Sequence, residues 1–456
     1  RTPEGAAETD EERPQRTVKF PKIQDMPHGI RLFVGGVAVS FGGMVLLGVV
    51  NYLIRRTLSQ ELPKPDFGFF YSMFALANLL TMLFQFGVKQ AKTILIANFM
   101  ARGQKKRINP LASSILFFTM TGSTMLCLGL LLAKSWLLEH FFKYPGGGTA
   151  YTIFLLYIFA LPIWGILLSI PHGMKNFPLY YGLSILQMGA ILCGCLCSAP
   201  RWGLNGVSAV WAASMLGTLL FAAWKIYSVY RIRISPRLAL SRRICRKIWE
   251  LCSWMSLSLA GIMLIGNLDT VCLTYLSTLD SVANYNIALP IVQIIQSLLV
   301  LPFVFMPIAS SMWQQKRYAE IRKIFRAANL LMLAAVLPTW FLSELLGGWV
   351  IGFLFDSAFL AAKPALVILA TGSLFLGIGQ FNLNLLNSSG SQKIGAAIVL
   401  CAIALNLALN AGLIPKFGIV GAAFATAGSY LLIAVASFTV CRVLLRRKER
   451  NSRLEQ

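Results

Sequence analysis

Polar side chains recur along one face of the apolar segment 69–94. They are separated by 7, 3, 4, 4 and 3 residues and comprise Tyr71, Asn78, Thr81, Gln85, Lys89 and Lys92. On an α-helix this spacing places all of them on one face. Because polar groups in an apolar segment are costly, such a face indicates a path for a polar molecule. The two ammonium groups at its end would attract an anion such as a diphosphate.

A second polar face occurs in the later apolar segment 282–308, where Asn286, Gln293 and Gln296 recur at the same spacing. It has no cations, because Val304 and Pro307 replace the two lysines. Side-chain amides also join membrane helices, and lysines near helix ends also extend to lipid headgroups. Two matching faces favour a central cavity. The predicted substrate ligands in it are Lys89, Lys92, Arg55, Arg56, Gln85, Asn78, Gln293 and Gln296.

Asp269 is the only carboxylate well inside an apolar segment. An unpaired charge there costs several kcal/mol, so we expect a partner. Arg55 and Arg56 end the first apolar segment at almost the same depth, and a pair with either would latch an outer gate. Alternatively, Asp269 takes up a proton or Na⁺ during transport, or it reaches the outer membrane interface.

The elements that position these residues belong to a membrane protein, since 57% of the residues are hydrophobic and only 13% are charged. Membrane-spanning segments of roughly 20 residues recur along the chain. We predict twelve, at about 32–54, 69–94, 111–133, 151–171, 179–199, 205–230, 250–275, 282–308, 327–350, 362–384, 393–414 and 417–441. Because backbone polar groups in lipid need internal partners, these segments must be helices, and the fold class is all-α polytopic.

The chain repeats itself once. The stretch 200–208 (PRWGLNGVS) recurs at 415–423 (PKFGIVGAA), and we call the interval from position 200 to position 415 the repeat offset. Six spans in each copy make the copies parallel, and such repeats are typical of transporters that bind substrate between two lobes. We predict a polar, disordered cytoplasmic tail (1–31), an N-terminal lobe (32–230), a basic cytoplasmic linker (231–249), a C-terminal lobe (250–443) and a basic cytoplasmic tail (444–456).

The net charge of +24 reflects membrane topology. If both termini are cytoplasmic, 33 of the 41 Lys and Arg residues lie on the cytoplasmic side, as the positive-inside rule requires. This distribution excludes a nucleic-acid partner. No phosphate-binding Gly-Lys motif and no metal motif occur, so we expect no enzyme and no cofactor. Transport would then be coupled to H⁺, to Na⁺ or to the membrane potential.

Two stretches resemble polysaccharide-type flippases. Arg56-Thr57-Leu58 followed by 66–70 (DFGFF) is similar to their first-loop pattern, and 269–307 is similar to their seventh and eighth helices. These motifs define the superfamily of oligosaccharide-lipid flippases and multidrug exporters better than either branch. The lipid II flippase branch resembles this chain less, since it usually has two further C-terminal helices.

The resemblance implies a protein of the bacterial inner membrane with two six-helix lobes that rock between inward-open and outward-open states. The cargo would be a polyprenyl diphosphate carrying a short glycan, moved from the cytoplasmic to the outer leaflet. Arg56 matches the first-helix arginine of the pattern. Lys92 lies where many members of the family have a basic residue after the second span. Expected partners are membrane lipids, a polysaccharide polymerase and a chain-length regulator. A cation-coupled multidrug exporter is the alternative, and a membrane glycosyltransferase or polymerase the third interpretation.

Overall fold

A computed structural model describes residues 28–84, 95–96, 99, 104, 108–231, 254–298 and 309–454. All regular structure of these residues is helical. The first part contains α1 (His28–Glu61), α2 (Lys64–Phe84), α4 (Ile108–Leu132), α5 (Lys134–Trp136), η3 (Leu137–Phe141), η4 (Pro145–Gly147), α6 (Gly148–Gly173) and α7 (Phe177–Tyr230). The second contains α9 (Trp254–Leu276), α10 (Leu279–Leu298), α12 (Tyr318–Ala334), α13 (Val336–Leu354), η6 (Ser357–Ala362), α14 (Lys363–Ser388) and α15 (Gln392–Leu454). We call these parts the N-terminal and C-terminal lobes.

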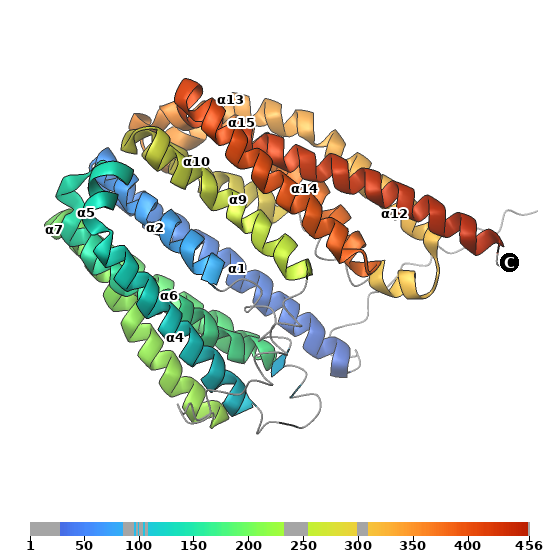
Figure 1. The fold of residues 1–456 in the computed structure, drawn as a ribbon, viewed down its shortest axis with the longest axis horizontal. Coiled ribbons are helices and arrows are strands. Elements are labelled where there is room, and N and C mark those ends of the chain that lie inside the picture. Colours follow the sequence, from blue (N-terminus) through green and yellow to red (C-terminus); the bar gives the residue numbers. More distant parts are fainter. Residues whose placement is uncertain are drawn as a thin grey trace, which may run out of the picture.

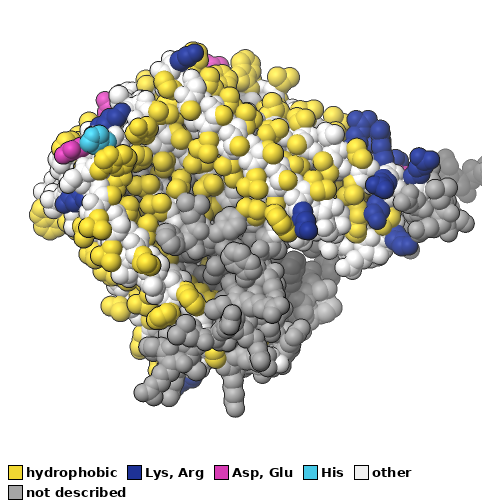
Figure 2. All heavy atoms as spheres, in the orientation of Figure 1, with side chains coloured by type: hydrophobic (Ala, Val, Ile, Leu, Met, Phe, Trp, Pro, Cys, Tyr) yellow, Lys and Arg dark blue, Asp and Glu magenta, His cyan; other side chains and the backbone are white. Residues whose placement is uncertain are grey.

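The helices form a polytopic membrane protein. Eight helices within the described residues are long and apolar enough to cross a membrane. Hydrophobic side chains are spread over the described part of the face drawn in Figure 2 (yellow), as expected of a surface in contact with lipid. α7 and α15 contain 54 and 63 residues, more than twice the ~20 needed for one crossing. The total of twelve spans and the boundaries of the lobes remain predictions.

Helix boundaries recur at the repeat offset. α6 and α14 match at both ends, and the starts of α7 and α15 are equivalent positions of the two copies. The starts of α2 and α10 are also equivalent, and so are the ends of α1 and α9. The spacing found in the sequence is therefore also the spacing of these helix ends.

Each long helix bends at one glycine. Gly203 in α7 has φ 51° and ψ −138°, and Gly418 in α15 has φ 53° and ψ −126°. A side chain would strain this backbone conformation, which glycine adopts readily. The two glycines occupy the same place in the repeated sequence stretch. The same bend therefore divides the long helix of each lobe into two apolar segments.

The lobes meet at one end and separate toward the other. α2 packs against α10 and α9, and a large apolar core includes Phe67 and Phe70 of one lobe with Leu273 and Tyr285 of the other. A second core lies within the C-terminal lobe alone. In Figure 1 the lobes diverge toward the end that carries the C-terminus.

The separated end is the basic one. Exposed cations gather at the end of α15, shown in dark blue in Figure 2: Arg442, Arg446, Arg447, Lys448 and Arg450. By the positive-inside rule this end faces the cytoplasm. The contact between the lobes lies at the opposite end, and we call it the outer seam.

Candidate functional site

Four hydrogen bonds join side chains of the N-terminal lobe to main-chain carbonyls across the outer seam. In each of them the N-terminal lobe donates. The pairs are Tyr52 Oη to Leu354 and Lys143 Nζ to Tyr275, both at 2.9 Å, Lys64 Nζ to Ala358, and Arg55 Nη1 to Asn286. The donors include three cations, yet every acceptor is a neutral carbonyl.

Three of these carbonyls lack the usual helical partner. Leu354 ends α13 and Tyr275 is the last residue but one of α9, and carbonyls at helix ends have no amide ahead of them. Asn286 lies inside α10, but four residues on is Pro290, which has no N–H. The N-terminal lobe thus supplies donors that the backbone of the C-terminal lobe lacks.

Arg55 is a buried cation in this seam. Its side chain is only 6% exposed, and its guanidinium carbon lies 4.4 Å from the centre of the Tyr71 ring, a cation–π distance. Nε has no hydrogen-bond partner among the described residues. A buried charge without a carboxylate partner is unfavourable, so Arg55 retains capacity for an anion.

The seam is closed tightly around this residue. Thr274 Oγ1 donates to Ser72 Oγ at 2.7 Å across the lobes. Gly68 packs directly against the main chain of Leu279, where an added Cβ would collide with the carbonyl oxygen. The close approach of the lobes at this end therefore depends on a glycine.

The loop that carries Lys143 is fixed by a tyrosine. Tyr144 donates a hydrogen bond to the Asp66 carboxylate at the start of α2. Partial burial raises the pKa of Tyr144 to about 12, helped by this hydrogen bond and by the charge of Asp66. The hydroxyl therefore stays protonated at neutral pH and remains a donor.

A buried carboxylate cluster lies within the C-terminal lobe. Asp269 on α9 is 1% exposed. Its Oδ1 accepts from Asn406 Nδ2 at 3.2 Å and Asn410 Nδ2 at 3.0 Å. Its Oδ2 accepts from Tyr285 Oη at 2.5 Å and from Thr426 Oγ1. All four donors are neutral, and they come from α10 and from both segments of α15.

The expected ion pair of Asp269 with Arg55 or Arg56 is absent from the described part of the chain. Arg55 binds the Asn286 carbonyl, and Asp269 binds the four neutral groups. Arg56 is exposed. The expectation that Asp269 reaches the outer interface is also wrong, since the residue is buried. Asp269 and the two arginines were expected at a similar depth in the membrane, but they do not pair, because residues of α15 surround Asp269.

The N-terminal lobe fills the equivalent space with apolar groups. The residues at the equivalent positions of the first copy are all buried: Ile54, Phe70, Ile191, Cys195 and Trp211. Two of them, Phe70 and Trp211, pack edge to face with ring centres 5.2 Å apart. The fold can therefore close this space without a charged group, so the carboxylate is not a requirement of the architecture.

The structure describes only some of the other predicted substrate ligands. Asn78 and Gln296 are half-buried on α2 and α10, and Gln293 is exposed. The contact between α2 and α10 agrees with the expectation that these helices face each other. Gln85, Lys89 and Lys92 lie outside the described residues, and their role stays a prediction.

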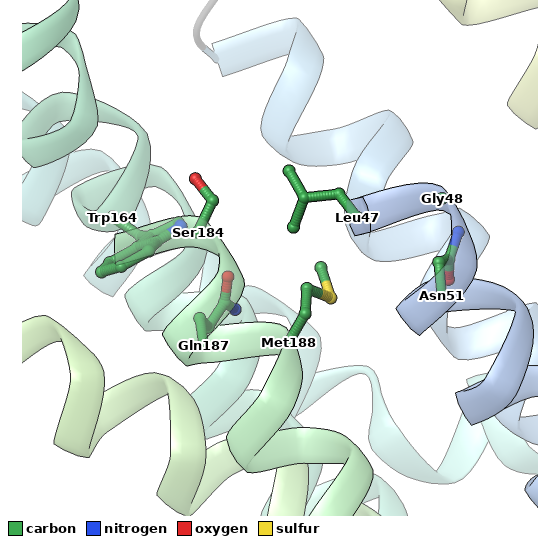
Figure 3. A pocket seen from close by; sticks show the side chains of 7 residues that line it. All are labelled: Leu47, Gly48, Asn51, Trp164, Ser184, Gln187 and Met188. Atoms are coloured by element: carbon green, nitrogen blue, oxygen red, sulfur yellow. The ribbon is translucent and has the colours of Figure 1, made fainter. Parts of the chain in front are cut away.

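An open pocket of about 330 Å³ lies between helices of the N-terminal lobe (Figure 3). Sequence analysis did not predict it. Its walls come from α1, α6 and α7: Leu47, Gly48, Asn51, Trp164, Ser184, Gln187 and Met188. Leu47, Gln187 and Met188 extend into the space between α1 and α7. The lining is neutral and combines apolar groups with two amides and a hydroxyl.

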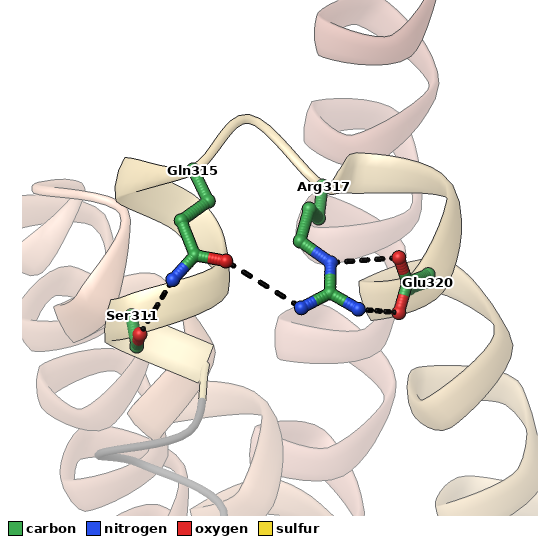
Figure 4. Close-up of polar contacts among 4 residues, drawn as sticks. All are labelled: Ser311, Gln315, Arg317 and Glu320. Atoms are coloured by element: carbon green, nitrogen blue, oxygen red, sulfur yellow. Dashed lines mark hydrogen bonds and ion pairs between the residues drawn. The ribbon is translucent and has the colours of Figure 1, made fainter.

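Polar contacts near the cytoplasmic end fix the turn before α12 (Figure 4). Arg317 binds Glu320 through two nitrogens, at 2.7 and 2.5 Å, and Nη1 also donates to Gln315 Oε1 at 3.4 Å. Gln315 Nε2 donates to Ser311 Oγ at 3.2 Å. The charged groups are half exposed, so this pair stabilises the fold little. The contacts order a basic surface turn and form no buried site.

Comparisons with known proteins agree with this architecture. The profile of a family described as polysaccharide biosynthesis protein matches residues 33–313. An uncharacterized membrane protein of Methanocaldococcus jannaschii, MJ1068, is 28% identical over 423 residues, which cover 88% of this chain and 82% of that protein.

Solved structures that share the fold include a transporter and a flippase. A multidrug resistance MATE family transporter of the MOP superfamily, in an inward-facing conformation, matches with a TM-score of 0.72 and 15% identity, over 89% of this chain and 96% of that chain. The lipid II flippase MurJ, in an inward closed conformation, matches with a TM-score of 0.71 and 13% identity, over 90% of this chain and 87% of that chain.

The apolar helices and the shared fold define a multi-pass membrane protein. The chain belongs to the polysaccharide biosynthesis protein family. The resemblance to polysaccharide-type proteins that the sequence motifs indicated is thereby confirmed.

Proposed function

We propose that the protein moves a polyprenyl-diphosphate-linked oligosaccharide from the cytoplasmic to the outer leaflet of a bacterial inner membrane. The glycan would be the repeat unit of a surface polysaccharide, and a polymerase and a chain-length regulator would act on it afterwards. A sugar chain cannot cross hydrocarbon unaided, because each unpaired hydroxyl costs several kcal/mol. Two lobes that separate alternately at the two ends would provide a polar route.

Arg55 is the observation that carries this proposal. It is a buried cation with an unused N–H group and without a carboxylate partner in the described residues. It lies at the outer seam, where the two lobes converge. Guanidinium groups bind phosphate oxygens in a two-pronged geometry and remain charged at any physiological pH. A diphosphate that enters between the lobes from the cytoplasm would therefore end its path at Arg55.

The predicted lysines fit the start of that path. Lys89 and Lys92 follow α2 in the sequence, toward the cytoplasmic end of its polar face. Cations at this position would raise the local concentration of an anionic lipid headgroup. Capture by the lysines would precede transfer to Arg55.

We extend the proposal to the energy source and assign it to the carboxylate cluster. The N-terminal lobe shows that the same space can be packed with apolar residues. The cluster is rich in oxygen atoms, and Asn410 Oδ1 is buried without a hydrogen-bond partner among the described residues. Carboxylate, amide and hydroxyl oxygens are ligands of hard cations, and a carboxylate also accepts a proton. Uptake of Na⁺ or H⁺ at Asp269 would then drive the exchange between states.

A multidrug exporter of the same fold remains the alternative. A cationic drug would need a carboxylate in its path, whereas the N-terminal lobe presents the cation Arg55 to the seam. This charge favours an anionic cargo. The fold, which a transporter and a flippase share, favours transport over a glycosyltransferase or polymerase.

The test is the fate of lipid-linked glycan in cells that lack the gene. We expect polyprenyl-diphosphate-linked glycan to accumulate on the cytoplasmic leaflet and surface polysaccharide to be lost, with both restored by the gene. Resistance to cationic dyes is assayed in the same strain. A normal amount of lipid-linked glycan together with increased sensitivity to cationic dyes would contradict the flippase and support the multidrug exporter.

A further inference from the structure

We propose that the open pocket between α1, α6 and α7 of the N-terminal lobe binds a sugar ring of the transported glycan. This inference rests on the proposed function and adds a position for the neutral part of the cargo. The volume of about 330 Å³ lies at the lower end of the range of small-molecule sites, roughly 300–1,000 Å³. The space is therefore suited to one or two sugar rings and not to a whole oligosaccharide.

The lining selects a neutral ligand that is both polar and apolar. None of its seven residues is charged, so a diphosphate would lose its hydration there without any compensating cation. A hydrocarbon chain would leave the amides of Asn51 and Gln187 without partners. A pyranose has hydroxyls at its edge and C–H groups on its face, which match the amides and the buried Trp164 ring.

Gln187 supplies the clearest unused hydrogen-bonding capacity. It is only 3% exposed, and its Nε2 lies 3.6 Å from Met215 Sδ, a weak acceptor. Its carbonyl oxygen accepts no hydrogen bond within the described part of the chain, and the side chain extends into the pocket in Figure 3. A primary amide offers two donors and an acceptor, so it can bind two adjacent hydroxyl groups.

The pocket lies on the cytoplasmic side of Arg55, where a sugar attached to a diphosphate bound at Arg55 could reach it. Leu47, Asn51 and Arg55 follow one another at intervals of four residues on α1, and therefore lie on one face. Each interval is about 6 Å along the helix. The pocket thus begins roughly one turn from Arg55 on the cytoplasmic side, within reach of a sugar attached directly to a diphosphate bound there.

Binding to the purified full chain in lipid nanodiscs tests the inference with two probes. One is farnesyl diphosphate, which has no sugar, and the other is the polyprenyl-diphosphate-linked glycan extracted from cells lacking the gene. We expect Gln187→Leu and Asn51→Leu each to weaken binding of the glycan-bearing probe about tenfold, as the loss of a hydrogen bond to a buried ligand does. Affinity for farnesyl diphosphate should stay unchanged, which also shows that the variants are folded. The matched control is Ser198→Ala, a buried polar residue of α7 outside the pocket, and should alter neither affinity.

Three results would overturn the inference. Unchanged affinity for the glycan-bearing probe in both pocket variants would show that the sugar does not bind in the pocket. An equal loss of affinity for both probes would show that the pocket binds the lipid diphosphate that the probes share. Tighter binding of farnesyl diphosphate to the leucine variants would indicate a site for hydrocarbon. Failure of the proposed function looks different, because the unmodified protein would then bind neither probe.

Discussion

The Arg55 guanidinium of one lobe donates a hydrogen bond to the main-chain carbonyl of Asn286 in the other lobe. That carbonyl is available because Pro290 interrupts the hydrogen bonds of α10. The contact is reversible at little cost, since a neutral carbonyl binds a guanidinium less strongly than a phosphate does. Under the proposed function, an incoming diphosphate would therefore displace Asn286 from Arg55 and loosen the outer seam.

Replacement of Arg55 should abolish most export. We expect Arg55→Gln to lower the rate of lipid-linked glycan export at least about tenfold, because a charge-assisted contact to phosphate is lost. Arg55→Lys should retain part of the activity, since the charge remains without the two-pronged geometry. Arg201→Gln, at an exposed arginine of α7, serves as the control. A larger loss in Arg56→Gln than in Arg55→Gln would transfer the role to the residue that the family pattern indicates.

A disulfide across the seam should lock the outer gate. Ser72 and Thr274 have side-chain oxygens 2.7 Å apart, so the substitutions Ser72→Cys and Thr274→Cys would place two thiols close together across the seam. Oxidation should stop export and reduction should restore it, measured as surface polysaccharide. Each single cysteine variant should be insensitive to oxidant. Full export by the oxidised double variant would mean that this seam need not open.

Gly68→Ala should destabilise the closed outer seam. The new methyl group would meet the carbonyl oxygen of Leu279, and main chain cannot yield as a flexible side chain does. We expect a lower yield of the disulfide between positions 72 and 274 when Gly68→Ala is added to the two cysteine substitutions. Gly266→Ala on α9 is the matched control, because its Cβ would point into open space. An unchanged disulfide yield would show that the lobes do not depend on this close approach.

Asp269→Asn should remove the ion dependence of transport and leave the fold intact. The amide keeps the shape of the carboxylate, and the N-terminal lobe shows that this space needs no charge. Export in inverted vesicles should no longer respond to a Na⁺ or H⁺ gradient, while the melting temperature changes little. Loss of the response to only one of the two gradients would identify the ion. Glu344→Gln, at an exposed carboxylate paired with Lys363, should keep both responses. A gradient response that survives in Asp269→Asn would contradict the assignment.

Neutralising Lys89 and Lys92 together should slow export without preventing membrane insertion. The reason is loss of the attraction for an anionic headgroup at the cytoplasmic mouth. Export is compared with the amount of protein in the membrane fraction. Lys134→Gln, at an exposed lysine of α5 that bonds Thr152, is the control. Normal export by the double variant would show that the two lysines do not contribute to transport.

The fold was largely predictable because its signals are local and repeated. Long apolar segments predict membrane helices whatever their tertiary contacts, and the motif around Gly203 and Gly418 predicted where each long helix is divided. The repeat also predicted that the second helices of the two lobes face each other. These features depend on hydropathy and spacing, which a single sequence displays.

The partners of Asp269 were harder to predict because they depend on how α15 folds back on itself. A signal was nevertheless present. Asn406, Asn410 and Thr426 are polar where the equivalent positions of the first copy are apolar, as Asp269 is relative to Ile54. A comparison of the two copies for joint changes in polarity would have assembled the cluster. The sequence did not show that Arg55, and not Arg56, is buried at the seam. Adjacent residues of a helix point in different directions, and only the structure shows which of them points toward the other lobe.

The outer gate places unequal demands on the two halves of the chain. Its acceptors are main-chain carbonyls, which every amino acid carries, so side chains at Leu354, Tyr275 and Ala358 can change in evolution without loss of these bonds. The donors have no such freedom, and neither does Pro290, whose ring exposes the carbonyl of Asn286. Relatives that keep this gate should therefore vary in the C-terminal half of each contact and retain a donor in the N-terminal half. A gene duplication that began with two equal copies would have diverged into one copy that supplies these four side-chain donors and one that supplies main-chain acceptors for them.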